Sequence, residues 1–321
     1  MALTSRITLT GSRPEDPEDY FSSSLAVIFP GDVTNQHGDA DHGLLYTSPH
    51  LPRPLHISLV DPVGEDDRQL FSHYLWNSSL LLAEMIEAAT LDLLPPSSSS
   101  SQAEPAHPLS APRSSFSVAG LSVLELGAGT ALPSQLCALL GASRVVVTDY
   151  PSPPVLANLR ANVERNVRPE NSPLGRAATP PPVAVVGHGW GDLSDLVVGV
   201  GDGDGGGGGV GGGFDRVLVA DCLWMPWQHD GLRRSVAGFL GRGPRARAWV
   251  VAGLHTGREA MRGFFGEEEL RLVGLEVEWI WERDCDGLER EWAWDRGVED
   301  VIERKRWLVV AVLRRIPGGD G

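Results

Sequence analysis

Two glycines and an acidic residue have the types and spacing that could hold a nucleotide-like cofactor. Gly127 and Gly129 follow the apolar run "SVLEL" and precede a proline-opened segment, and Glu125 stands two places before the first glycine. A strand that ends in a glycine turn and re-enters a helix exposes free backbone N–H groups. Such a turn serves dinucleotides, phosphates and S-adenosylmethionine alike, so the glycines alone do not decide the ligand.

The spacing disfavours a dinucleotide. A G-x-G-x-x-G array that starts at Gly127 requires a small residue at position 132, where this chain has Leu132. The small residue is instead Ala131, at the third alternate position. Asp149 ends the next strand-like run, "SRVVVTD", at about the distance where a carboxylate would accept hydrogen bonds from both ribose hydroxyls. The pattern therefore favours a ribose-containing cofactor other than NAD.

The stretch around Gly127 resembles motif I of the class I S-adenosylmethionine-dependent methyltransferases, whose seven-stranded sheet ends in a β-hairpin. The resemblance implies that the glycine turn approaches the cofactor's methionine and ribose. It also implies that Glu125 helps to orient the cofactor's amino group, directly or through water, and that Tyr150 flanks the adenine side. Ala131 departs from the glycine that is commoner there, and we expect its methyl group to narrow the cofactor's slot.

Four further segments resemble the fungal protein N-methyltransferases of the methyltransferase 16 group. They are "YLWNSSLLLAEMI", "TDYPSPPVLANLRANVERN", "GHGWGD" and "ADCLWMPWQHDGLRRSV", and the resemblance covers residues from about 70 to 316. It implies that Trp76 leans over the cofactor, that Trp190 packs by the adenine ring, and that Asp221 lies beside the methyl-acceptor channel. Trp224 departs from the group's pattern, which usually has a tyrosine at that place.

The implied reaction moves a methyl group from a sulfonium to a nucleophile held in line behind it, with water excluded. An amine must be neutral when it attacks, and a nearby carboxylate or histidine can orient it or receive its proton. Asp221 is the first candidate for this catalytic role. His229 and His255 are weaker candidates, because loop histidines are more often surface residues than bases.

Three functions stay open at this point. The first is a methyltransferase of a protein amine, either a lysine or an N-terminus, because the resembling group includes such methyltransferases of elongation factors; a translation factor is then one substrate to consider. The second is a methyltransferase of a small acceptor, nicotinamide-like or a secondary metabolite. Its distinguishing feature would be a closed aromatic pocket built from Trp224, Trp227 and the insert at 282–306. The third is a non-catalytic methyltransferase fold that serves as an interaction module, which the intact motif residues argue against.

The size, net charge and cysteine content of the chain limit the classes of partner and ligand that it could bind. The chain has 321 residues, of which 42% are hydrophobic, and this suffices for one substantial core. Its formal charge of −15 argues against a nucleic-acid-binding protein, which needs a basic patch, and suits a basic protein substrate. The three cysteines form no C-x-x-C pair, so neither a disulfide framework nor a metal site is indicated: Cys137, Cys222 and Cys285.

No membrane segment is predicted. The apolar stretch near Leu80 is interrupted by Glu84 and Glu87, and the first residues lack the apolar core of a signal peptide. We therefore expect a cytoplasmic protein.

The elements that must position these residues alternate along the chain. Five apolar runs have the length of strands: "LSVLEL", "SRVVVTD", "PVAVVG", "FDRVLVAD" and "RAWVVAG". "LPSQLCALLG" and "PPVLANLRANVERN" between the early runs have a helical pattern, which is typical of a parallel sheet covered by helices. Two last runs, "LEVEWIW" and "RWLVVAVLRR", lack a convincing helix between them and should pair antiparallel. The fold class is therefore α/β, with a Rossmann-like sheet of seven strands that closes in a hairpin.

The remaining sequence divides into an extension, a linker and an insertion. Residues 1–94 should form an N-terminal extension of short strands, "LAVIF", "GLLYT" and "LHISLV", followed by a helix over 69–94; the last two strands should form a hairpin. Residues 95–115 read as a low-complexity linker too polar to pack. The methyltransferase-like domain spans 116–316 and carries a glycine-rich insertion at 199–213.

Overall fold

The computed structural model describes residues 2–10, 34–38, 43–60, 74–93, 110–175, 179–194 and 213–318. They fold around one central sheet with the strand order β12-β11-β13-β10-β9-β6-β7-β8. Its strands are β6 (Ser122–Leu126), β7 (Arg144–Asp149), β8 (Val183–Gly187), β9 (Arg216–Ala220), β10 (Arg247–Gly253), β11 (Leu275–Asp284), β12 (Glu289–Glu291) and β13 (Trp307–Arg315). The strands from β6 to β10 are parallel, and β13 pairs antiparallel with β10 and β11. The predicted α/β class and the antiparallel end of the sheet are confirmed.

The sheet has one strand more than the seven that the apolar runs predict. β12 pairs antiparallel with the end of β11, and β11 itself runs on to Asp284, beyond the apolar stretch "LEVEWIW". The sequence of β12 is Glu-Arg-Glu and its outer residues are exposed, because it forms the edge of the sheet. A search for hydrophobic runs cannot reveal a strand of this composition.

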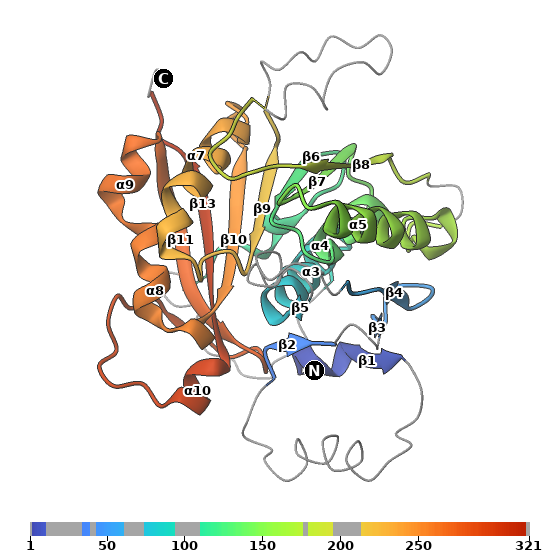
Figure 1. Ribbon diagram of the computed structural model, residues 1–321, viewed down its shortest axis with the longest axis horizontal. Coiled ribbons are helices and arrows are strands. Elements are labelled where there is room, and N and C mark those ends of the chain that lie inside the picture. Colours follow the sequence, from blue (N-terminus) through green and yellow to red (C-terminus); the bar gives the residue numbers. More distant parts are fainter. Residues whose placement is uncertain are drawn as a thin grey trace.

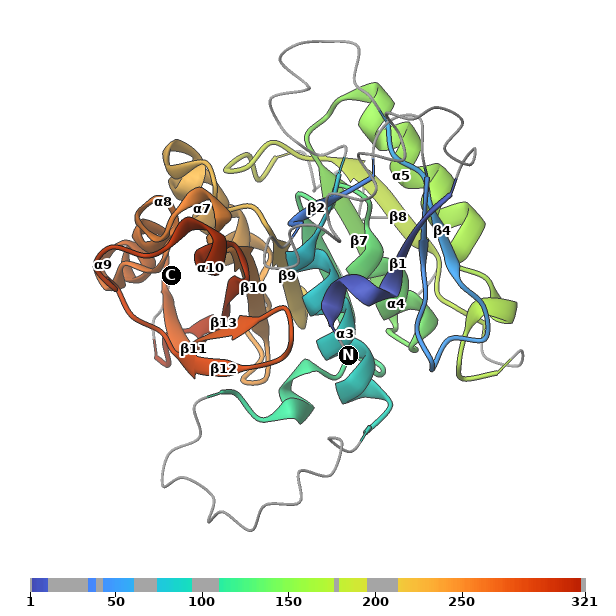
Figure 2. The ribbon, with the colours of Figure 1, turned by 90° about the horizontal axis from the view of Figure 1, so that it is seen from below.

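Helices cover both faces of the sheet, as Figures 1 and 2 show. One face packs against α3 (Asn77–Thr90), α4 (Leu132–Leu139) and α5 (Pro153–Asn166), and the other against α7 (His229–Phe239), α8 (Arg258–Arg262) and α9 (Glu267–Leu272). A short helix, α10 (Val301–Lys305), precedes β13. Because both faces are covered, strands such as β9 are buried at every position, which explains their continuous apolar sequences.

The N-terminal extension forms a small sheet of its own. Its antiparallel strands are β1 (Ile7–Thr10), β3 (Gly43–Tyr46) and β4 (Leu55–Ile57), in the order β1-β3-β4. The expected hairpin between β3 and β4 is confirmed, whereas the run "LAVIF" lies outside the described residues. A further pair joins β2 (Gln36–His37) to β5 (Leu75–Trp76).

Two boundaries in this region differ from the expectation. The helix predicted over 69–94 is observed only as α3, because Leu75 and Trp76 are extended and pair with β2, and the chain leaves the helix after Thr90. Residues 69–73 and 94 lie outside the described part. Residues 110–115, at the end of the predicted linker, pack against the domain. Ala111 is buried, and a 3₁₀ turn (Arg113–Phe116) lies against α3. Of the glycine-rich insertion only Gly213 is described.

Two asparagines of α5 attach this extension to the domain. The side chain of Asn162 accepts a hydrogen bond from the Ser58 N–H at 2.8 Å and donates one to the Ser58 carbonyl at 2.9 Å. Asn166 makes the same pair of bonds with His56, at 3.0 and 2.7 Å. An amide side chain carries one acceptor and two donors, so each asparagine replaces a missing strand partner along the edge of β4. Figure 2 shows β4 lying beside α5.

Candidate functional site

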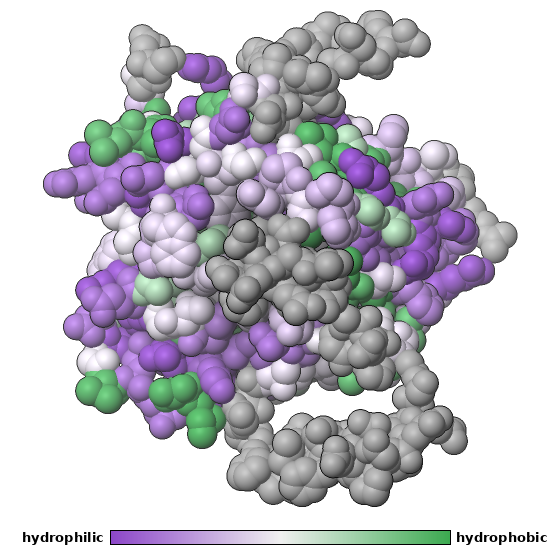
Figure 3. All heavy atoms as spheres, viewed as in Figure 1, coloured by the Kyte–Doolittle hydropathy of each residue, from purple (hydrophilic) through white to green (hydrophobic). Residues whose placement is uncertain are grey.

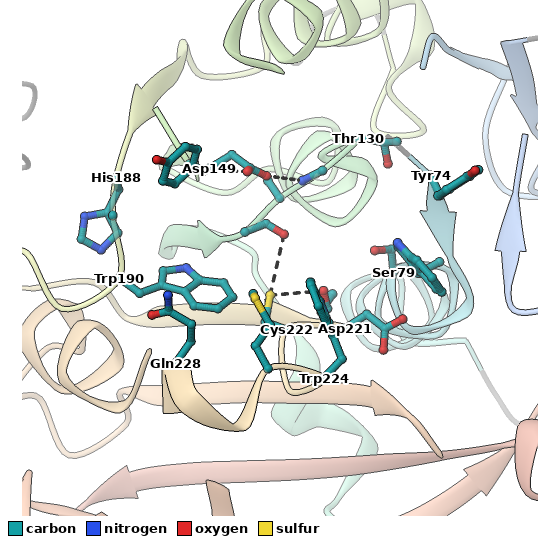
Figure 4. Close-up of a pocket in the computed structure, with 18 residues that line it drawn as sticks. Tyr74, Ser79, Thr130, Asp149, His188, Trp190, Asp221, Cys222, Trp224 and Gln228 are labelled. Carbon is teal, nitrogen blue, oxygen red and sulfur yellow. Dashed lines mark hydrogen bonds between the residues drawn. The ribbon is translucent and has the colours of Figure 1, made fainter. Parts of the chain in front are cut away.

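A pocket opens where the carboxyl ends of β6, β7, β8 and β9 meet the start of α3, as Figure 4 shows. The carboxyl edge of a parallel sheet is the usual place for a ligand in open α/β folds. Seven of the eight predicted site residues line this pocket: Trp76, Gly127, Gly129, Asp149, Tyr150, Trp190 and Asp221. The eighth, Glu125, does not.

The glycine turn needs both of its glycines. Gly127 has φ +62° and Gly129 has φ +55°, in the left-handed region that other residues rarely adopt. A Cβ added at Gly127 would lie 2.7 Å from Sγ of Cys222 and 3.0 Å from the ring of Trp190. The bare backbone therefore keeps the pocket open between β6, β9 and the segment after β8.

Asp149 presents a buried carboxylate to the pocket. Its Oδ2 accepts a hydrogen bond from the Gly129 N–H at 2.7 Å, and its Oδ1 accepts one from the Tyr150 N–H at 2.7 Å. Burial raises the pKa of Asp149 to about 6, although the two N–H groups act in the opposite direction. Each oxygen keeps a further lone pair, so the carboxylate can still accept hydrogen bonds from a ligand.

Glu125 lies behind the glycine turn. It is fully buried, and its Oε2 accepts a hydrogen bond from the Ser134 N–H at 3.1 Å, in the first turn of α4. Burial raises the pKa of Glu125 to about 8, which the bond from Ser134 only partly offsets. Here Glu125 supports the start of α4.

Ala131 does not narrow the pocket, contrary to the expectation. Its side chain is fully buried, it is absent from the pocket lining, and its φ is +59°. The methyl group therefore imposes a backbone cost, of roughly 1–2 kcal/mol for a left-handed residue. Glycine would avoid that cost, which gives a physical reason for its frequency at this position.

Asp221 lies directly after β9, with φ +60°. Its Oδ1 accepts a hydrogen bond from the Gly253 N–H at 2.9 Å, and its own N–H donates to the Val251 carbonyl at 2.8 Å. Burial raises the pKa of Asp221, while His255 and the Gly253 N–H favour the charged form. A half-buried, fixed carboxyl group of this kind can orient an amine or take its proton.

Trp76 reaches the pocket from the position just before α3. Its ring stacks on the imidazole of His255, with centroids 5.1 Å apart and planes at 12°, and it meets Tyr74 edge to face. Of the two histidines considered as bases, His255 thus stacks on a side chain that lines the pocket. His229 is buried against Phe264, and its Nε2 hydrogen-bonds the Leu223 carbonyl at 2.9 Å.

The aromatic residues expected to close the acceptor end do not enclose it. Trp224 lines the pocket, but Trp227, which meets it edge to face, is 72% exposed. Trp292 of the insert packs on Phe265, and Trp294 is half exposed. No described residue of the insert at 282–306 lines the pocket.

The insert is held by a buried ion cluster instead. Glu282 is fully buried and accepts hydrogen bonds from Arg258 at 2.6 Å, Arg290 at 2.7 Å and Arg296 at 3.3 Å. Burial alone would raise the pKa of Glu282, but the bonds from Arg258 and Arg290 outweigh it and lower the pKa. On the side of the molecule that Figures 1 and 3 show, much of the surface is hydrophilic. Apolar residues lie near the position of α10.

Several residues that line the pocket were not predicted as site residues from the sequence, among them Tyr74, Ser79, Thr130, Cys222 and Gln228. Cys222 directly follows the strand-end Asp221, so its position in the chain could have indicated it. In the parts of the chain that the structure describes, no three His, Cys, Asp or Glu side chains gather as a metal site would need. Each helix in those parts is too short or too polar to cross a bilayer.

These residues suit S-adenosylmethionine. The cradle that a Cβ at Gly127 would fill admits a ligand close to the backbone, and the free lone pairs of Asp149 suit ribose hydroxyls. Trp190 and the half-exposed Tyr150 offer flat surfaces for a purine ring.

Comparison with known sequences supplies the family. No family model matches the sequence. A curated protein of Gibberella zeae, named protein N-terminal and lysine N-methyltransferase EFM7, is 30% identical over 281 residues, which cover 86% of this chain and 85% of that protein. This chain belongs to the EFM7 methyltransferase family. The predicted place among the class I S-adenosylmethionine-dependent methyltransferases is thereby confirmed.

Other EFM7 proteins match over shorter stretches. The EFM7 protein of Eremothecium gossypii is 33% identical over 187 residues, which are 58% of this chain and 56% of that protein. The EFM7 protein of Cryptococcus neoformans is 36% identical over 118 residues, which cover 34% of its length. Among solved structures, a methyltransferase from Streptococcus mutans has a TM-score of 0.45 at 12% identity, over 92% of this chain and 65% of that one.

Proposed function

We propose that this protein is an S-adenosylmethionine-dependent N-methyltransferase of protein amines, acting on a lysine side chain or an N-terminus. The observation that carries the proposal is the pair of fixed carboxyl groups in one pocket, Asp149 against the glycine turn and Asp221 at the end of β9. The names of the EFM7 relatives, which describe N-terminal and lysine methylation, support the choice of acceptor. A translation factor is the substrate we would try first.

The residues divide into a cofactor end and an acceptor end. Asp149, Gly127 and Gly129 would hold the ribose and methionine part of the cofactor, and Trp190 and Tyr150 the adenine. The cofactor, when bound, supplies a methyl group activated by a positively charged sulfur. Asp221 would accept a hydrogen bond from the acceptor amine and receive its proton, so that the amine attacks in its neutral form.

A methyltransferase of a small acceptor was expected to have a closed aromatic pocket, and the described residues do not form one. A flat acceptor would need walls on several sides, yet Trp227 points to solvent and the described insert residues stay off the pocket. An open acceptor end suits the flexible end or side chain of a protein. The acidic composition favours a basic one.

The deciding experiment supplies radiolabelled S-adenosylmethionine to the purified protein with two fractions of an extract of its own organism, one of macromolecules and one of metabolites. We expect label in a discrete protein band. Asp221→Ala should abolish that band while keeping cofactor affinity. Label confined to metabolites would favour the small-molecule alternative, and no label despite cofactor binding would favour the interaction module.

A further inference from the structure

Three aromatic or charged groups meet beside the acceptor end of the pocket. Trp76 comes from the start of α3, Asp221 from the end of β9, and His255 from the 3₁₀ turn (Leu254–Thr256) that follows β10. Trp76 and Asp221 line the pocket, but His255 does not. His255 is thus placed to act on the site through its two neighbours.

The first contact fixes the plane of Trp76. The imidazole of His255 lies nearly parallel to the indole, at 12° and 5.1 Å between centroids, while Tyr74 meets the indole at 83°. A ring held on its face and its edge keeps one orientation. The indole wall of the pocket therefore depends on the ring of His255.

The second relationship is electrostatic: His255 and Asp221 both lie beside Gly253, and His255 favours the charged form of Asp221. A Cβ built at Gly253 would lie 2.6 Å from Nδ1 of His255 and 3.6 Å from Oδ1 of Asp221, so both groups approach the same bare Cα. Gly253 also donates its N–H to Asp221. Nδ1 of His255 is buried and makes no hydrogen bond to the described residues. This edge of the imidazole is therefore available to interact electrostatically with the carboxyl group.

We propose that His255 is a positioning residue where the cofactor end and the acceptor end of the pocket meet: its face holds the indole of Trp76 on the cofactor side, and its Nδ1 edge orients Asp221 on the acceptor side. This inference rests on the proposed function for the role of Asp221 and adds a residue to that site. The face and the edge have separable effects. The face should govern cofactor affinity, through Trp76, and the edge should govern turnover, through Asp221.

Two substitutions separate these effects. His255→Phe keeps a flat ring on Trp76 and removes Nδ1, so cofactor affinity measured by calorimetry should stay within about twofold of wild type. Labelling of the macromolecular fraction at saturating cofactor should fall by about tenfold, as expected when a reacting group loses its orientation. His255→Ala removes both contacts, and cofactor affinity should then also fall by about fivefold.

A glycine substitution tests the edge without changing the histidine. Gly253 has ordinary dihedral angles, φ −77° and ψ 134°, so alanine is allowed there but its Cβ would push Nδ1 of His255 aside. Gly253→Ala should lower turnover by about tenfold with little effect on cofactor affinity. Gly243→Ala is the matched control, because its Cβ would meet no atom within 4 Å, and it should behave as wild type.

The results distinguish this inference from the proposed function. Wild-type turnover by His255→Phe, or equal cofactor affinities of the phenylalanine and alanine variants, would overturn the positioning role. If the wild-type protein labels no macromolecule, the proposed function fails, but the affinity comparison needs no acceptor and still decides whether the ring of His255 positions Trp76. Rescue of affinity by phenylalanine would then support it, and absence of rescue would contradict it.

Discussion

The backbone N–H of Gly129 donates a 2.7 Å hydrogen bond to Oδ2 of Asp149, joining the turn after β6 to the end of β7. The bond orients a buried carboxylate toward the pocket and fixes the glycine turn at once. Two residues far apart in the sequence therefore form one binding surface, and disturbing either should affect the same ligand.

Asp149→Ala should weaken the binding of S-adenosylmethionine. The ribose hydroxyls would lose a charged acceptor, which is worth on the order of 1–3 kcal/mol. Calorimetric titration measures the change, and Glu268→Ala, which removes an exposed carboxylate on α9, is the control that should leave affinity unaltered. An unchanged dissociation constant in Asp149→Ala would mean that Asp149 does not contact the cofactor.

Glu125 should make the protein less stable as the pH rises. Its pKa of about 8 lies above the ordinary value of 4.5, so the folded protein holds a proton that the unfolded chain releases between these pH values. The free energy of unfolding should fall across this window by roughly 1 kcal/mol per pH unit from this group. Glu125→Gln should remove that slope and be more stable than wild type at pH 8. Denaturant unfolding at several pH values tests it, and equal slopes would show that Glu125 is not neutral when folded.

Gly127→Ala should impair both stability and cofactor binding. The added Cβ would meet Cys222 and Trp190 as well as strain a left-handed backbone. Gly120→Ala isolates the strain, because Gly120 has φ +72° but its Cβ would meet no atom within 4 Å; it should cost only about 1–2 kcal/mol. Thermal melts and titrations compare the two. Equal losses of stability with normal cofactor binding in both would contradict the close approach at Gly127.

Asn162→Ala should loosen the N-terminal extension. The substitution leaves the Ser58 N–H without its partner and the Ser58 carbonyl with one donor fewer, at a cost of about 1–3 kcal/mol for two partly buried hydrogen bonds. Asn158→Ala is a milder comparison, since Asn158 makes one bond to the same carbonyl at 3.0 Å. Hydrogen exchange at β4 should accelerate more in the Asn162 variant. Equal protection in both variants would argue against the role given to Asn162.

The sequence predicts which residues gather at the carboxyl edge of the sheet, for a physical reason. Parallel strands end at one edge of a sheet, so Gly127 and Asp149, each placed just after an apolar run, had to meet there. The same logic placed Asp221. Strand periodicity and glycine spacing are local patterns, so they can be recognised in the sequence without knowledge of the tertiary structure.

Contacts between distant elements left no such signal. The stack of His255 on Trp76 joins the 3₁₀ turn after β10 to the end of β5, and Arg290 and Arg296, which bond Glu282, look in the sequence like part of an ordinary solvated charge run. The resemblance to motif I also implied that Glu125 helps to orient the cofactor's amino group, directly or through water, whereas the turn directs its side chain behind the glycines. Such details depend on side-chain direction, which spacing alone does not encode.

The most direct test of the account is a calorimetric titration of the purified protein with S-adenosylmethionine and, separately, with NAD. The glycine spacing and the buried Leu132, which occupies the place of a third glycine, predict micromolar binding of S-adenosylmethionine and no measurable binding of NAD. Equal or preferential binding of NAD would contradict the assignment of this pocket to a methyltransferase.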